Sequence, residues 1–128
     1  MSKKVKINNI LPVLLTLNLM LALSGCGRRE GRPYGQAISN HNLTEIGAIL
    51  SDIDSFNGKT VTIEGNIIRE CPTGCWFDVK DEAGIIHVDI NPSGFAIPQK
   101  VGKRVTVEGK ISLQDSRPIL VGKGVEIR

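Results

Sequence analysis

The sequence predicts a small, mostly β domain in which five short strands close into a barrel, preceded by a short helix. Two observations support this prediction. Five stretches between residues 59 and 127 have the apolar–polar pattern and turn boundaries of short strands. Glycines interrupt the first, fourth and fifth stretches, at Gly65, Gly109, Gly122 and Gly124, where barrel strands need bends. The length of 128 residues allows one domain and excludes a multidomain enzyme with a large cleft.

The positive charge of the chain is concentrated ahead of the predicted domain. The whole chain has 16 Lys and Arg against 13 Asp and Glu, a net charge of +3. From Leu43 onward there are 10 basic and 12 acidic residues, so the folding part lacks a basic footprint for nucleic acid. Aromatic residues are only 4% of the chain, which leaves few rings for stacking bases. These counts make single-stranded nucleic-acid binding the least favoured of the alternative functions.

The N-terminal segment has the layout of a bacterial export signal. Three lysines open it, and residues 10–23 are mostly apolar but too short for a membrane-spanning helix of about 20 apolar residues. The segment ends in Leu23-Ser24-Gly25-Cys26, which resembles the lipobox of bacterial lipoproteins. The resemblance implies that residues 1–25 are a signal peptide, which is cleaved before Cys26. It also implies that Cys26 carries several acyl chains, palmitate among them, and several chains anchor a protein stably to a membrane. An uncleaved helical anchor, or secretion with a free Cys26, is the alternative.

A lipid anchor implies a place in the cell envelope, on the extracytoplasmic side of a membrane. Gly27, and not Asp, follows the lipidation site, which favours the outer membrane in a cell that has two membranes. Residues 26–42 contain three glycines, a proline and three arginines without a periodic apolar pattern, so we expect a flexible tether there. The domain itself is expected over residues 43–128.

The elements of this domain follow from spacing and from turn residues. Ile46, Ile49 and Leu50 lie at helical spacing and predict a helix over 44–50. Thr44 and Asn42 are its candidate N-caps, and Asn57-Gly58 predicts a turn after it. Strands are then predicted at 59–69, 75–80, 85–90, 104–112 and 118–127.

Three motifs together resemble a known family. The pattern Gly-Lys-x-Val-Thr-[Ile/Val]-Glu-Gly occurs twice, starting at Gly58 and at Gly102, and Cys71-Pro72-Thr73-Gly74-Cys75-Trp76 lies between the copies. These motifs resemble the extracytoplasmic OB-fold domains of bacterial lipoproteins, over residues 46–127. The resemblance implies an all-β fold with small α content, a five-stranded Greek-key barrel. It leaves the function open, because OB folds host many functions.

The second and third strands sort their side chains into two faces when they are paired across the turn Asp81-Glu82-Ala83-Gly84. Five apolar residues fall on the core face: Phe77, Val79, Ile86, Val88 and Ile90. The outer face then has Trp76 opposite Asp89, Asp78 opposite His87, and Ile85.

The outer face of these two strands is where OB folds usually bind their ligands. Trp76, Asp78, His87 and Asp89 are therefore the candidate ligand-binding residues. The alternative is structural: Trp76 packs under the N-terminal helix, and Asp78–His87 is a cross-strand pair of a few tenths of a kcal/mol.

Cys71 and Cys75 lie four residues apart around a Pro and a Gly. We expect a disulfide between them, because they are the two thiols left after lipidation and the domain faces an oxidising space. A soft-metal site for copper or zinc that uses Cys71, Cys75 and His87 is the second interpretation. A thiol–disulfide oxidoreductase is the third, but that chemistry favours Cys-x-x-Cys at a helix N-terminus.

Motifs of the common enzyme classes are missing. The sequence has no phosphate-binding glycine loop, no His-Glu-x-x-His and no Gly-x-Ser-x-Gly. We therefore expect a non-enzymatic binding or assembly module without a cofactor. Its expected partners are the membrane, through the lipid, and either an envelope protein or a small ligand on the outer face.

Overall fold

The computed structural model describes residues 31–128. The expected signal peptide and the lipidation site Cys26 lie outside the described residues. Within residues 31–128 no helix is long and apolar enough to cross a bilayer. The elements in chain order are β1 (Arg32–Gly35), α2 (Ile46–Ser51), α3 (Ile53–Phe56), β2 (Thr60–Glu70), β3 (Trp76–Lys80), β4 (Ile85–Asp89), the 3-10 turn η1 (Asn91–Ser93), β5 (Arg104–Gln114) and β6 (Arg117–Ile127).

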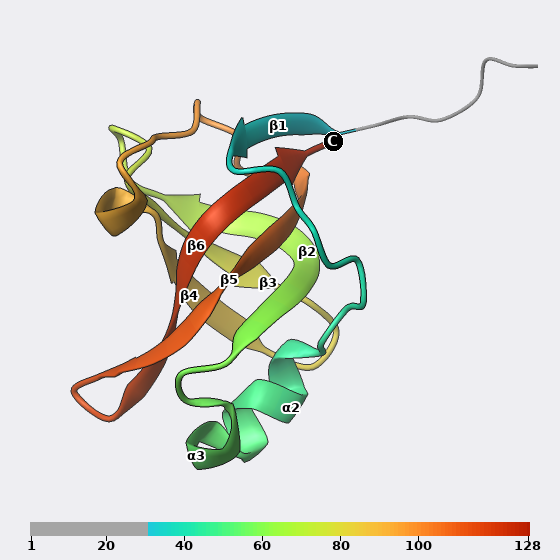
Figure 1. The fold of residues 1–128 in the computed structure, drawn as a ribbon. Helices are drawn as coiled ribbons and strands as arrows, with labels where there is room; N and C mark the ends of the chain where they lie inside the picture. Colours follow the sequence, from blue (N-terminus) through green and yellow to red (C-terminus); the bar gives the residue numbers. More distant parts are fainter. Residues whose placement is uncertain (1–30) are drawn as a thin grey trace, which may run out of the picture.

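The five strands β2 to β6 close into a barrel (Figure 1). Their order around the barrel is β6-β4-β3-β2-β5, and β5 pairs with β6 to complete the ring. Neighbouring strands run antiparallel, except that β4 and β6 are parallel. This is the arrangement of an OB-fold-like Greek-key barrel, so the predicted fold class is confirmed, and the five predicted strands agree with the observed ones to within about two residues.

The strand β2 is long and strongly curved, so that it pairs with β5 through its first half and with β3 through its second (Figure 1). At Gly65 an added β-carbon would lie 2.4 Å from the carbonyl oxygen of Lys80, so only glycine lets the two strands come this close. The bend predicted at Gly65 is present, and a bulge in the pairing with β3 lies further along the strand, between Ile67 and Arg69. A second register shift, next to Gly109, bends the β5–β6 pair as predicted.

The barrel interior is filled by branched aliphatic side chains around the fully buried ring of Phe77. The helix α2 closes one end with Ile46 and Ile49, both 0% exposed (Figure 1). The predicted N-caps are wrong, because Glu45 precedes the helix without a side-chain cap and the Thr44 amide donates to the Thr62 carbonyl.

The described part of the expected tether, residues 31–42, belongs to the folded domain, so the tether prediction is wrong for these residues. The strand β1 pairs antiparallel with the end of β6, with Arg32 opposite Ile127. The side chain of Ile38 is buried, 7% exposed. The pairing of β6 with β4 covers only three positions, which leaves an edge of β6 that β1 occupies. The four residues of β1 show no apolar–polar alternation, so the sequence did not predict this strand.

Candidate functional site

The structure confirms the predicted pairing of β3 with β4. Trp76 lies opposite Asp89, Asp78 opposite His87, and Lys80 opposite Ile85. The five residues assigned to the core face are all buried, with at most 1% of any of them exposed. The predicted outer face is therefore the outer face of the barrel wall.

The carboxylate of Asp78 organises this face. Although it lies on the outer side, Asp78 is only 6% exposed. Its Oδ1 is 2.7 Å from Nδ1 of His87. Its Oδ2 accepts a hydrogen bond from Nε of Arg69 at 2.9 Å and forms an ion pair with Nη2 of the same guanidinium at 2.7 Å. With this carboxylate as acceptor, the His87 ring carries its proton on Nδ1 when neutral, so its Nε2 is the atom that can meet a ligand.

The ring of Trp76 completes the arrangement. It lies 5.2 Å from the His87 ring, between centroids, and the Arg69 guanidinium carbon is 5.8 Å from the Trp76 centroid. A guanidinium at this distance from an indole face is attracted by the ring quadrupole. We call Arg69, Trp76, Asp78 and His87 the Asp78 cluster.

Two of the predicted roles on this face change. The helix α2 packs beside the turn at Ala83 and Gly84, which is at the other end of β3 from Trp76, so the alternative that placed Trp76 under the helix is wrong. Asp89 does not join the cluster, because its Oδ1 accepts a hydrogen bond from the Asn91 amide and thereby supports the η1 turn.

Sequence reasoning missed Arg69, because its position depends on the bulge. In an unbroken register, the pairs Asn66–Lys80 and Ile67–Val79 would be followed by Ile68, and not Arg69, opposite Asp78. The shift after Ile67 instead sets Arg69 opposite Asp78. The adjacent apolar pair Ile67-Ile68 breaks the alternation and is the one signal that could have revealed the bulge.

A cleft of about 660 Å³ adjoins the Asp78 cluster. It runs between the outer face of β3 and β4 and the β5–β6 hairpin, and Leu50 of α2 reaches its edge. Its charged side chains are matched in number, two arginines and two aspartates. Its lining residues are Leu50, Arg69, Asp78, Ile85, His87, Gln114, Asp115, Arg117, Pro118 and Ile119.

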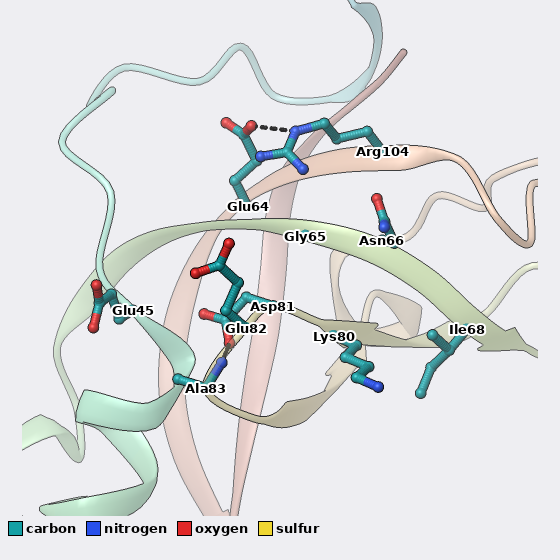
Figure 2. Close-up of a pocket in the computed structure, with 10 residues that line it drawn as sticks. All are labelled: Glu45, Glu64, Gly65, Asn66, Ile68, Lys80, Asp81, Glu82, Ala83 and Arg104. Carbon is teal, nitrogen blue, oxygen red and sulfur yellow. Dashed lines mark hydrogen bonds and ion pairs between the residues drawn. The ribbon is translucent and has the colours of Figure 1, made fainter.

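A second hollow, of about 670 Å³, lies on another side of the barrel and is lined by four acidic side chains (Figure 2). Two of these carboxylates are engaged within the fold. Glu64 pairs with Nε of Arg104 at 2.5 Å, and Asp81 accepts the amide of Ile46 at 2.8 Å. We therefore interpret this hollow as a structural feature and not as the candidate binding site.

The thiols of Cys71 and Cys75 are free in the structure, with Cys71 buried and Cys75 half-buried. Among residues 31–128 no group of three or more His, Cys, Asp and Glu side chains is placed to hold a metal ion. The three residues of the metal interpretation are thus not brought together. Cys75 pairs with Ile90, whose side chain is in the core, while His87 projects from the outer face.

Comparison with known proteins identifies the fold and no more. No protein-family model and no curated protein matches the sequence. Among solved structures, the hypothetical protein ygiW from E. coli is similar, with a TM-score of 0.54 and 18% sequence identity over 74% of this chain and 99% of that chain. At this identity the similarity shows a shared barrel.

Proposed function

We propose that this protein is a binding module, held by a lipid on Cys26 to the extracytoplasmic side of a membrane, whose Asp78 cluster and adjoining cleft bind another protein of the cell envelope. One observation carries the binding role. The buried Asp78 carboxylate holds Arg69 and His87 in place while their side chains stay 71% and 39% exposed. Side chains that are fixed before binding lose less conformational entropy when a partner arrives.

The chemistry of the cluster favours a protein surface as the partner. Arginine and tryptophan are among the residues that contribute most to protein–protein affinity. The positive charges of Arg69 and Arg117 are matched in the cleft by Asp78 and Asp115. A site for a nucleic-acid backbone needs a surplus of positive charge, which this cleft lacks. A small polar ligand is the second candidate, because the volume of the cleft lies within the usual range for ligand pockets.

Site-specific crosslinking in native membranes tests the binding role. A photo-reactive amino acid replaces Ile85, which lines the cleft and is 48% exposed, and Lys110 on β5 is the control position. We expect a discrete crosslinked product from position 85 that is weakened severalfold by Trp76→Ala or His87→Gln. The exposed His41 provides the matched variant His41→Ala, which should leave the product unchanged.

The outcome separates the alternatives. Equal crosslinking from both positions, or a product that is indifferent to Trp76→Ala in a variant that still unfolds cooperatively, would contradict the proposal. Absence of a protein adduct together with chemical-shift changes at the cleft on adding envelope extract would favour a small ligand.

The anchor is supported by the lipobox-like motif at Leu23-Ser24-Gly25-Cys26. Mass spectrometry of the mature protein should find cleavage before Cys26 and added acyl mass. The variant Cys26→Ser should abolish the acyl mass and release the protein from membranes. Membrane retention of an unmodified, uncleaved chain would contradict the anchor without touching the binding role.

A further inference from the structure

The loop between β2 and β3 carries two thiols on a backbone that is already held in place. The Gly74 amide donates to the Cys71 carbonyl at 2.8 Å, which closes a tight turn, and the Ile97 amide donates to the Gly74 carbonyl at 3.1 Å. The side-chain amide of Gln99 donates to the carbonyls of Cys71 and Pro72, both at 3.0 Å. None of these bonds involves sulfur, so the loop conformation does not depend on a disulfide.

The two sulfur atoms share one hydroxyl group. Oγ1 of Thr73 lies 3.1 Å from the sulfur of Cys71 and 3.6 Å from the sulfur of Cys75. Hydrogen bonds from the Cys75 thiol, and then from Thr73, lower the pKa of Cys71 to about 6. This lowered pKa favours the thiolate form of Cys71, and the thiolate is the nucleophile of thiol–disulfide exchange.

We propose that Cys71 and Cys75 form a thiol–disulfide exchange site, which takes a disulfide bond as its substrate and passes reversibly between the dithiol of this structure and a disulfide within the loop. This inference does not rest on the partner-binding role. The disulfide expected from the sequence would then not be permanent. It would form and break according to the thiol–disulfide balance of its surroundings.

The exchange balances in two displacements. The Cys71 thiolate attacks one sulfur of the incoming disulfide, breaks that bond and releases one thiolate. Cys75 then gives its proton to water, attacks the Cys71 sulfur of the mixed disulfide and releases the second thiolate. The two cysteine thiols are thereby oxidised by two electrons, and the incoming disulfide is reduced to two thiols.

Two features favour a labile bond over a permanent one. The hydrogen bonds to the Cys71 sulfur stabilise the reduced form, which makes the disulfide easier to reduce. The ring between Cys71 and Cys75 is short, and cross-links that close short loops contribute least to the stability of a fold.

The test equilibrates the purified mature protein in buffers of reduced and oxidised glutathione. Alkylation followed by mass spectrometry counts free thiols, and the fluorescence of Trp76, the only tryptophan of the sequence and the neighbour of Cys75, follows the same transition. We expect both signals to change together and to reverse when the glutathione ratio is reversed.

Three variants sharpen the result. Cys75→Ser should trap glutathione on residue 71, because the second displacement is lost. Thr73→Val should slow alkylation of Cys71 by about threefold or more near pH 6, and Thr73→Ser should restore the rate. In the unaltered protein the alkylation rate should rise with a midpoint near pH 6.

Each contrary result has a distinct meaning. A disulfide that persists at every glutathione ratio and yields only to dithiothreitol would show a structural staple and overturn the proposal. Two thiols that stay free in excess oxidised glutathione would overturn it as well. An alkylation midpoint near that of an ordinary thiol, unchanged by Thr73→Val, would remove its chemical basis.

Discussion

Oδ1 of Asp78 lies 2.7 Å from Nδ1 of His87, across the pair of strands that forms the outer wall of the barrel. The pair is more than the exposed cross-strand contact that alternation alone suggests, because Arg69 occupies the other oxygen of the same carboxylate. A buried carboxylate with partners on both oxygens sets the direction of two exposed side chains. The buried carboxylate of Asp78 thus holds the exposed side chains of Arg69 and His87 in a defined orientation.

Replacing Asp78 by Asn should disturb this order. The amide offers one acceptor oxygen where Arg69 and His87 need two, so its own NH2 group, buried at position 78, faces a donor and has no acceptor. We expect a loss of about 1–3 kcal/mol in the free energy of unfolding, measured by urea denaturation. Asp89→Asn is the matched control on the same face, because the Asp89 carboxylate holds a single exposed amide, and it should cost less. Equal denaturation midpoints for the two variants would contradict the central role of Asp78.

A substitution at Gly74 should be far more damaging than one at Gly58, although both residues have positive φ angles, +74° and +81°. A β-carbon at Gly74 would lie 1.9 Å from the Ile97 carbonyl oxygen, whereas nothing lies within 4 Å at Gly58. Gly58→Ala should cost about 1–2 kcal/mol for backbone strain alone. Gly74→Ala should cost about 1–3 kcal/mol more, because the loop must leave Ile97. Thermal unfolding compares the two, and similar losses would contradict the close approach.

Asp81 supports the start of α2 from a distant turn. Its Oδ2 accepts the Ile46 amide at 2.8 Å, and its Oδ1 accepts the amides of Ala83 and Gly84. Asp81→Ala should therefore cost about 2 kcal/mol, as the loss of a helix cap and of a turn together. Glu82→Ala, at the exposed neighbouring position, should change stability by less than about 0.5 kcal/mol. Hydrogen exchange at Ile46 should accelerate only in the Asp81 variant.

Glu108 should make the attachment of residues 39–40 sensitive to acid. The amide of Asn40 donates to its carboxylate at 2.8 Å, and this bond, with those from Ser39, lowers the pKa of Glu108 from 4.5 against the opposing effect of burial. A lowered pKa in the fold means that the stabilisation is present above pH 4.5 and is lost as pH falls through the folded value.

Hydrogen exchange at the Asn40 amide measures this effect. In the unaltered protein, protection at Asn40 should decrease below pH 4.5, after correction for intrinsic exchange. Glu108→Gln should reduce protection at neutral pH and flatten this pH dependence, while Glu126→Gln serves as the charge control. Unchanged protection in Glu108→Gln would mean that other contacts hold the segment.

The register of β3 and β4 was predictable because two local features agree. Strict alternation allows Phe77 and Val79 to face the core only in one phase, and the four-residue turn at Asp81–Gly84 then sets which residues are opposite. The candidate site was predictable to the same extent. Trp76, Asp78 and His87 follow from this pairing, and Arg69 does not, since a bulge in β2 decides its position.

The sequence by itself determined the five barrel strands, the helix before them and the two faces of β3 and β4, because periodicity, turn residues and glycines act within a few residues of one another. Only the tertiary structure decided that β1 lies on the edge of β6, that Asp81 supports α2, and that Arg69 meets Asp78. These contacts join residues whose partners are selected by barrel closure. Closure depends on the twist and bulges summed over all the strands, which no local pattern encodes.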